Sequence, residues 1–250
     1  MKLNDQVAII TGAGSGMGAA IAERFAQAEI AGLAIADVNI DAATKVADDL
    51  SSRYGCTAIP IAADVSNQDQ VEAMAAKTQE QFGRIDILVN NAGICPFVSW
   101  EDTTLEDWNR IMQVNLGGPF LCTKAVAPYM QKRQYGRIIY ISSLAGFVGS
   151  LVANVGYGVS KMGVVPLMKS VAKIYAADGI HANAVAPGTI DTNMTAGFGE
   201  EGMRVLTEAS LLKRQAQPEE MANTILFLVS DHASYITGAT LHANGGALLV

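Results

Sequence analysis

Short apolar runs alternate along this chain with longer stretches in which apolar residues recur every three or four positions. The short runs have the length and composition of buried strands, and the longer stretches have the period of amphipathic helices. Because no linker interrupts the alternation, the pattern predicts parallel βαβ units in one domain, residues 1–250. Strands are predicted at residues 7–11, 33–36, 57–62, 85–89, 137–141, 182–186 and 240–243.

Polar residues and a proline mark where several predicted helices begin. Ser66 and Asp69 have the spacing of a capping box before a helix that runs to Phe82, and Thr104 starts another helix. Pro218 stands in the first turn of the last helix. Further helices are expected after the glycines near residue 16, at residues 41–52 and from about residue 156.

Composition narrows the range of partners. Half of the 250 residues are hydrophobic and 16% are charged, with a formal net charge of −7. So apolar a chain can bury a large core, which argues against disorder, and its negative charge argues against nucleic acid as a partner. Three cysteines without a CxxC pair fit a reducing cytoplasm, and the histidines lack the spacing of metal ligands, so no metal is expected.

An uncharged run at residues 138–160 is long enough to span a bilayer. It contains Ser142, Ser143, Ser150 and Asn154 together with several glycines, which a lipid-facing helix would not favour. We therefore expect a buried strand, a loop and a helix in this run. The chain enters its first strand without a signal peptide, so a cytoplasmic protein that does not bind membranes is expected.

A glycine-rich segment, residues 11–18, lies between the first predicted strand and the first helix. Gly12, Gly16 and Gly18 permit a tight turn and let backbone N–H groups approach a pyrophosphate, although such a turn can also be a plain connection. Asp37 follows the second strand, where a carboxylate can bind ribose hydroxyls and would repel a 2′-phosphate. The sequence therefore favours NAD over NADP, with a solvated turn residue as the alternative for Asp37.

Tyr157 and Lys161 stand four positions apart at the start of a predicted helix, which places both on one face. A nearby ammonium lowers the pKa of a tyrosine, so that the phenol can exchange a proton with an alcohol or ketone. Taken alone, the pair could equally belong to an ordinary helix surface. Other motifs accompany it.

Seven motifs in sequence order are the glycine loop, Asp64-Val65, Asn-Asn-Ala-Gly at residues 90–93, Asn115, Ser142-Ser143, Tyr157 with Lys161, and Pro187-Gly188 with Thr192. In this set and order, from Val7 to about Gly246, the chain resembles the short class of the short-chain dehydrogenase/reductase family. The resemblance implies an α/β fold with one doubly wound, seven-stranded parallel sheet of Rossmann type, helices on both faces and strand order 3-2-1-4-5-6-7. The active site would lie at the carboxyl ends of the strands.

The same resemblance implies roles for the site residues. Tyr157 would act as general acid or base, and Ser143 would hydrogen-bond the substrate oxygen. Lys161 would lower the Tyr157 pKa and bind the nicotinamide ribose, and Asn115 would hold a water for proton relay. The residues implied to contact NAD(H) are Gly12, Ser15, Gly16, Met17, Gly18, Asp37, Asp64, Val65, Asn91, Tyr157, Lys161, Pro187, Gly188, Ile190 and Thr192.

The chain departs from the family pattern in a few places. Glu29 stands where the helix after the glycine loop usually ends in glycine, and Gly32 comes late, which could shift the entry to the second strand. Asn244 replaces the usual aspartate before two glycines, which puts a structural hydrogen bond in doubt. Ser143 is aligned as the catalytic serine, with Ser142 as the alternative.

The region that binds substrate in this family is apolar here and includes an expected lid at about residues 189–212. Residues 94–100 and 144–160 contain no arginine or lysine, so a neutral hydrophobic or aryl substrate is expected. Residues 95–108 also look like the corresponding segment of aryl-alcohol and pyridoxal 4-dehydrogenases. Candidate pocket residues, each of which could instead be a core or subunit contact, are Cys95, Phe97, Leu144, Val152, Met194 and Phe198.

These patterns predict an NAD-dependent alcohol dehydrogenase or carbonyl reductase. The family resemblance implies a homotetramer that packs through helices at residues 117–129 and 163–177. One alternative is a 3-oxoacyl-(acyl carrier protein) reductase, which the resemblance associates with NADPH and with a basic docking patch that this sequence does not show. An alternative of another class is a catalytically idle dinucleotide-binding regulator. The complete set of catalytic residues argues against it.

Overall fold

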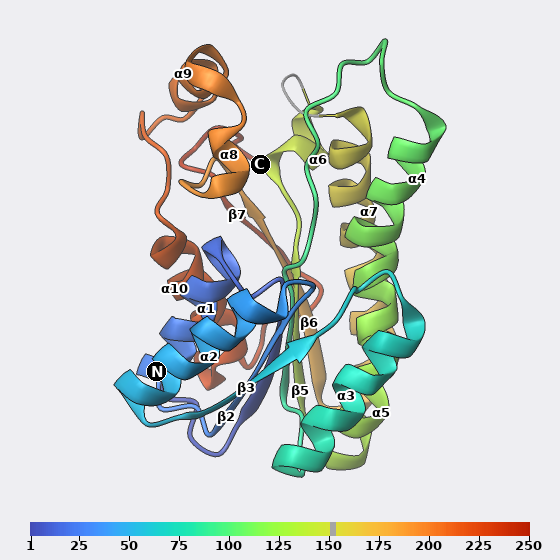
Figure 1. Cartoon of the computed structure of the whole chain (residues 1–250), viewed down its shortest axis with the longest axis vertical. Coiled ribbons are helices and arrows are strands. Elements are labelled where there is room, and N and C mark those ends of the chain that lie inside the picture. The colour runs from blue at the N-terminus through green and yellow to red at the C-terminus, as the bar shows by residue number, and fades with distance from the viewer. Residues whose placement is uncertain (151–153) are drawn as a thin grey trace.

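A computed structural model describes residues 1–150 and 154–250 of the chain (Figure 1). The described residues form one seven-stranded sheet in the order β3-β2-β1-β4-β5-β6-β7, in which every neighbouring pair is parallel. This confirms the predicted fold class and strand order. The strands are β1 Val7–Thr11, β2 Gly32–Asp37, β3 Thr57–Ala62, β4 Ile87–Asn90, β5 Gly136–Ile141, β6 Ile180–Pro187 and β7 Thr240–Ala243.

Helices cover both faces of the sheet (Figure 1). One layer contains α1 Gly16–Gln27, α2 Ile40–Tyr54 and α10 Pro218–Val229. The other contains α3 Gln68–Phe82, α4 Leu105–Met112, α5 Gly118–Arg133 and α7 Val155–Tyr175. Three short helices lie near the carboxyl ends of the strands, and they are α6 Leu144–Val148, α8 Asn193–Ala196 and α9 Gly199–Ala209.

The core consists of two clusters, one on each face of the sheet. Adjacent residues of β1 show the division, because Ile10 belongs to the same cluster as Phe25 of α1, and Ile9 belongs to the same cluster as Met168 of α7. Successive side chains of a strand point to opposite faces, so a strand covered on both sides must be apolar throughout. All five residues of β1 are buried accordingly. This burial is why the parallel strands read as continuous apolar runs.

The start of α3 differs from the expectation that Ser66 caps it. Asn67 is the N-cap residue, and its side chain accepts a hydrogen bond from the Gln70 N–H. The Ser66 hydroxyl instead donates to Asp64 Oδ1 at 2.6 Å. Since Asn is at least as good an N-cap as Ser, the predicted helix forms one residue later with a different cap. The helix start at Thr104 is confirmed, and Thr104 and Asp107 form a capping box there. The proline in the first turn of α10 is also confirmed.

The unusual residues before β2 have a structural explanation. Glu29 has a φ of 61°, which glycine adopts more readily, and its carboxylate pairs with Lys2 at 2.6 Å. Gly32 begins β2 opposite Val7, where a Cβ would lie 2.6 Å from the ring of Phe82. The late glycine is therefore required by packing against α3. Asp37 still ends β2.

The uncharged run at residues 138–160 is divided among several elements. Its described parts are most of β5, the short helix α6 and the start of α7. Within the ranges that the structure describes, no helix combines the length and hydrophobicity that crossing a membrane requires.

Candidate active site

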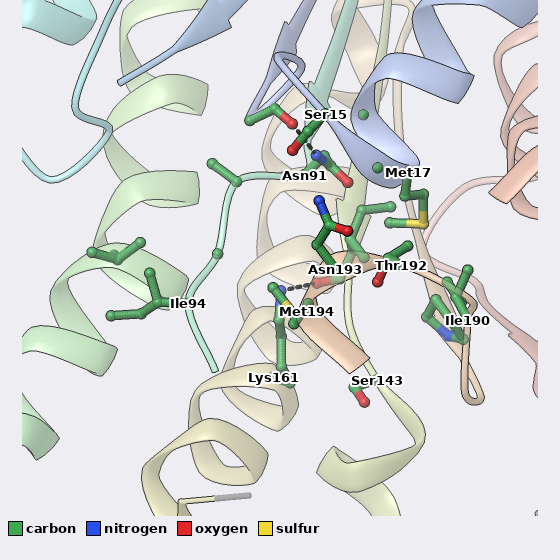
Figure 2. Close-up of a pocket in the computed structure, with 18 of the residues that line it drawn as sticks. Ser15, Met17, Asn91, Ile94, Ser143, Lys161, Ile190, Thr192, Asn193 and Met194 are labelled. Carbon is green, nitrogen blue, oxygen red and sulfur yellow. Dashed lines mark hydrogen bonds between the residues drawn. The ribbon is translucent and has the colours of Figure 1, made fainter. Parts of the chain in front are cut away.

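A groove with a cavity volume of about 320 Å³ runs along the carboxyl ends of the strands. Residues that follow six of the strands line it, so its walls come from segments far apart in sequence. Figure 2 shows Ser15 and Asn91 toward one end of the view, and Lys161 and Ser143 toward the other. This is the position at which a doubly wound parallel sheet is expected to bind a ligand.

The glycine loop forms one wall of the groove. Gly12 and Gly16 have φ values of +63° and +53°, which side chains other than glycine rarely adopt. A Cβ on Gly18 would overlap the Gly12 carbonyl oxygen, so this glycine lets α1 begin directly against the loop. Among the described residues, no side chain caps the N-terminus of α1, where Ser15 is the N-cap residue. The backbone N–H groups of this turn are therefore suited to hold a diphosphate.

Asn91 holds this loop against the end of β4. Its Nδ2 donates to the carbonyl oxygens of Thr11 and Gly12 at 2.9 and 3.0 Å. In return, the Thr11 hydroxyl accepts hydrogen bonds from the backbone N–H groups of Asn91 and Ala92, both at 3.1 Å. Asn91 also lines the groove, so it combines a structural role with a position suitable for cofactor contact.

Asp37 lies in the groove at the end of β2, as the sequence predicts. Its two carboxylate oxygens accept hydrogen bonds from Gly14 N–H and Asn39 N–H, each at 2.9 Å. These bonds fix the carboxylate beside the glycine loop. A ribose with free hydroxyls suits this position, whereas a 2′-phosphate would meet a negative charge.

Asp64, which the resemblance implies as an NAD(H) contact, follows β3 beside the groove and is not part of its described lining. Ala63 and Val65 line the groove, whereas Asp64 accepts hydrogen bonds from Ser66 and lies 3.4 Å from Arg110 Nη2. These partners, the Ser66 hydroxyl first, lower the pKa of Asp64. Arg110 itself lines the groove. Arg110 comes from α4, 46 positions after Asp64 in the chain. No local sequence pattern joins the two residues, so Arg110 was not among the predicted site residues.

Tyr157 and Lys161 both enter the groove from the first turns of α7, and Lys161 Nζ lies 5.9 Å from the centre of the Tyr157 ring. The ammonium donates to the Ile141 carbonyl at the end of β5, at 2.9 Å. Burial lowers the pKa of Lys161 to about 8. Lys161 is 4% exposed, so its charge interacts with few waters and strongly with groups in the groove.

The pKa of Tyr157 differs from the sequence-based expectation. Burial raises it above its ordinary value, and a hydrogen bond with the Ser143 side chain offsets only part of the rise. The sequence-based prediction of a lowered Tyr157 pKa is therefore wrong, because burial raises this pKa overall. A charge argument from spacing omits desolvation, which depends on everything that surrounds the phenol. At neutral pH the phenol is protonated and can donate.

The two neighbouring serines have different surroundings. Ser142 is 1% exposed and donates its hydroxyl proton to the Lys161 carbonyl at 2.7 Å, so it joins β5 to α7. Ser143 begins α6, accepts a hydrogen bond from Ala145 N–H at 3.2 Å, and shares a hydrogen bond with Tyr157. Of the two hydroxyls, that of Ser143 is the one placed beside the phenol.

Asn115 lies in a π-helical turn, Gln113–Gly117, between α4 and α5. The fully buried side chain bonds both polar atoms of the Ile94 backbone, at 2.8 and 2.9 Å, and its Nδ2 also donates to Ser160 Oγ. A Cβ on Gly93 would lie 3.3 Å from Lys161 Nζ, so this glycine lets the loop after β4 approach α7 closely. The turn at Asn115 thus fixes that loop beside Lys161.

The end of β6 and the loop that follows it form another wall of the groove. Pro187, Gly188, Ile190 and Thr192 all line the groove, and Thr192 caps α8. Asn244 packs against Gly188, because a Cβ added to Gly188 would lie 3.0 Å from the Asn244 backbone. Its Oδ1 accepts a hydrogen bond from Gly246 N–H and its Nδ2 donates to Leu248. The substitution of Asn for Asp therefore retains an acceptor bond and adds a donor bond.

A smaller cavity, which we call the carbonyl cavity, adjoins the groove at Ser143 and Tyr157 and has a volume of about 110 Å³. Cys95, Leu144, Met194 and Phe198 line it, as predicted from the sequence. Burial raises the pKa of the Cys95 thiol to about 11, so the thiol is neutral.

Two further candidate pocket residues have different outcomes. Phe97 is 44% exposed and is not among the described residues that line the carbonyl cavity. Its ring packs edge-to-face on Phe198, with ring centres 4.8 Å apart. It therefore supports the pocket wall, a contact that spacing in sequence could not reveal. Val152 lies outside the described residues.

Comparisons with known proteins extend over the whole chain. A family model described as enoyl-(acyl carrier protein) reductase matches residues 12–247. A 3-oxoacyl-(acyl-carrier-protein) reductase of Aquifex aeolicus is 39% identical, covering 98% of both chains. Meso-2,3-butanediol dehydrogenase of Serratia marcescens is also 39% identical, covering 99% of this chain and 96% of its own. A short-chain type dehydrogenase/reductase of Mycobacterium marinum superposes with a TM-score of 0.94 at 34% identity, covering 100% and 98%.

Proposed function

Because the chain belongs to the short-chain dehydrogenase/reductase family, we propose that it oxidises and reduces a substrate with NAD(H) at a CH–OH group. The proposed substrate pair is a neutral, mainly hydrophobic or aryl secondary alcohol and its ketone. One observation carries the proposal. The phenol of Tyr157 and the hydroxyl of Ser143 share a hydrogen bond where the groove meets the carbonyl cavity. A substrate oxygen placed there can meet both hydroxyls.

The proton chemistry of reduction follows from these two groups. Ser143 can donate a hydrogen bond to the substrate oxygen and stabilise the negative charge that develops on it. Tyr157, protonated at neutral pH because burial raises its pKa, can then give its proton to that oxygen. In the oxidative direction the same phenol must accept the proton from the alcohol. The nicotinamide, when bound, supplies or accepts the hydride.

Lys161 and Asn115 support this proton transfer from neighbouring elements. A Lys161 ammonium stabilises the phenolate that Tyr157 becomes after it gives up its proton, because opposite charges attract strongly where water is scarce. Asn115 holds the Ile94 backbone and Ser160, whose hydroxyl donates to the Tyr157 carbonyl at 2.7 Å. These contacts favour a fixed distance between phenol and ammonium.

NAD is proposed as the cofactor because of the charge in the groove. The turn from Gly12 to Gly18 fits a diphosphate, and the fixed carboxylate of Asp37 favours a ribose without a phosphate. Arg110 also lines the groove, but its guanidinium is engaged by Asp64 and by the Ser66 hydroxyl, at 3.4 and 2.9 Å. NADP is therefore less well accommodated.

The chemistry of the carbonyl cavity favours a neutral substrate. Within the described residues that line it, no side chain carries a charge, and the apolar groups of Leu144, Met194 and Phe198 predominate. A carboxylate or phosphate placed there would lose its hydration without gaining a cation.

The proposal also includes a cytoplasmic location and a homotetramer. Three free cysteines support the location, and the exposed apolar side chains of α5 and α7 support the assembly.

A second candidate is reduction of a 3-oxoacyl group on acyl carrier protein. Its support is the 39% identity over nearly the full length of the Aquifex aeolicus reductase. Turnover of a 3-oxoacyl-(acyl carrier protein) with NADPH, at rates well above those for free ketones with NADH, would favour this candidate. An idle dinucleotide-binding regulator would instead bind NADH and turn over neither substrate.

The test is a nicotinamide absorbance assay over aliphatic and aryl ketones with NADH and NADPH, on the parent protein and on Tyr157→Phe. We expect turnover with preference for NADH, and a loss of about 10²–10⁴-fold in Tyr157→Phe, the contribution of a positioned general acid. NADH binding should persist in the variant, since the phenyl ring remains. Asp37→Ala should reduce the preference for NADH. Undiminished turnover in Tyr157→Phe would contradict the proposal.

A further inference from the structure

A third cavity adjoins the carbonyl cavity. This rear cavity has a volume of about 300 Å³ and lies among α9, α10 and the segment after β7. Leu144, Gly188, Thr189 and Leu206 line both the rear cavity and the carbonyl cavity. The two spaces therefore share a wall, in which Leu144 of α6 and Leu206 of α9 are the large side chains.

The sizes of the two cavities indicate what each could hold. Sites for small molecules commonly have volumes of about 300–1,000 Å³, and the carbonyl cavity at about 110 Å³ lies well below that range. It has room for the reacting carbon and one small substituent. The rear cavity alone reaches the lower end of the range. A substrate larger than a short ketone can extend into it past the shared wall.

The lining of the rear cavity defines the chemistry of that extension. Leu212, Met221, Ala243 and Ala247 provide apolar contacts. The charged groups in its described lining are Arg214 and Glu220, which bind each other through two hydrogen bonds of 2.6 Å. A paired guanidinium offers little to a substrate carboxylate, because binding would require this ion pair to break. The cavity thus suits a neutral alkyl chain.

We propose that the substrate has two unequal arms, a short one held in the carbonyl cavity and an extended, neutral alkyl arm that passes between Leu144 and Leu206 into the rear cavity. This inference rests on the proposed alcohol and ketone chemistry and names its substrate class. It assigns Leu206 of the lid helix α9 as a specificity-determining residue. The lid would then select chain length while Tyr157 and Ser143 hold the oxygen.

The experiment measures kcat/KM for methyl ketones from butan-2-one to decan-2-one with NADH. Burying each added methylene should raise kcat/KM by about fourfold until the rear cavity is filled. Leu206→Trp should narrow the passage and lower the ratio of the decan-2-one to the butan-2-one value by at least about tenfold, the effect of losing two such methylenes. Ala247→Phe, which fills the rear cavity from another segment, should lower the same ratio. Val205→Trp is the matched control, because Val205 lies on α9 outside both cavity linings.

The outcomes distinguish this inference from the proposed function. A chain-length dependence that Leu206→Trp and Ala247→Phe reduce, and Val205→Trp does not, supports it. Turnover of short ketones without such a dependence overturns it and leaves the proposed function intact. If no ketone is turned over, the proposed function fails, and calorimetry of 2-alkanols from four to ten carbons binding to the enzyme with NADH decides the inference. Affinity independent of chain length then overturns it.

Discussion

At the scale of single residues, burial decides the acid–base properties of Tyr157 and Lys161. Lys161 is 4% exposed and its pKa falls to about 8, while the pKa of Tyr157 rises. Desolvation disfavours the charged form of each group, and the two shifts have opposite signs because the charged forms are an ammonium and a phenolate. At neutral pH the site therefore holds a protonated phenol beside a predominantly protonated amine.

The lowered pKa of Lys161 predicts a pH dependence of stability. Between about pH 8 and pH 10 the unfolded chain still binds the lysine proton, near its ordinary pKa of about 10.4, whereas the folded chain has released it. The free energy of unfolding should thus gain from this group as pH rises through that window. Lys161→Met removes the effect, so its stability relative to the parent should fall by about 2 kcal/mol from pH 7 to pH 10. Urea unfolding at several pH values measures this, and Lys169→Met on the exposed side of α7 should show no such trend.

Glu29 provides a prediction about backbone conformation. Its φ of 61° is unfavourable for any residue with a Cβ, by roughly 1–2 kcal/mol in the left-handed region. Glu29→Gly should raise the free energy of unfolding by about 0.5–1 kcal/mol, since the greater freedom of the unfolded glycine offsets part of the gain. Thermal unfolding measures the change. Glu29→Ala is the control, and an equal gain there would contradict the explanation, because alanine retains the Cβ.

At the scale of elements, contacts between loops shape the carbonyl cavity. The segment of α8 and α9, which we propose as the substrate lid, meets the loop after β4 through the ring pair Phe97 and Phe198. The π-helical turn at Asn115 binds that same loop through the Ile94 backbone. Two elements that are distant in sequence from the lid therefore set its position over the carbonyl cavity.

Gly197 allows a test of this contact. Its φ of −71° suits alanine, but a Cβ there would overlap the Phe97 ring. Gly197→Ala should displace Phe97, loosen Phe198 and raise KM for the substrate severalfold, with a change in stability below about 1 kcal/mol because the lid is exposed. Steady-state kinetics measures KM. Phe97→Ala should reproduce the effect, and Glu200→Ala on the same lid should leave KM unchanged.

At the scale of the whole molecule, one layer of helices presents apolar side chains to solvent. Phe120 of α5 and Val159, Met162 and Ile174 of α7 are between 41% and 65% exposed. A net charge of −7 would keep separate copies apart unless such contacts offset the repulsion. An exposed apolar surface on helices of one layer is typical of an interface between subunits.

We therefore expect light scattering to give a mass about four times the 26.3 kDa of the chain. Phe120→Glu should shift the distribution toward smaller species, because it would bury a carboxylate in the interface at a cost of several kcal/mol. Ala76→Glu, on the exposed side of α3, adds the same charge elsewhere and should not change the mass. A parent protein that is monomeric at all concentrations would refute the assembly.

Local sequence patterns predicted the alternation of strands and helices, the parallel sheet and most of the residues that line the groove at its carboxyl edge. Local periodicity and motif spacing carry this information, because a buried strand must be apolar on both faces and a dinucleotide loop must contain glycine. Four features came only from the fold. They are the serine that adjoins Tyr157, the upward shift of the Tyr157 pKa, the pairing of Asp64 with Arg110, and the rear cavity lined by Leu206. Each of these depends on distances and burial among segments far apart in the chain, which no local pattern encodes.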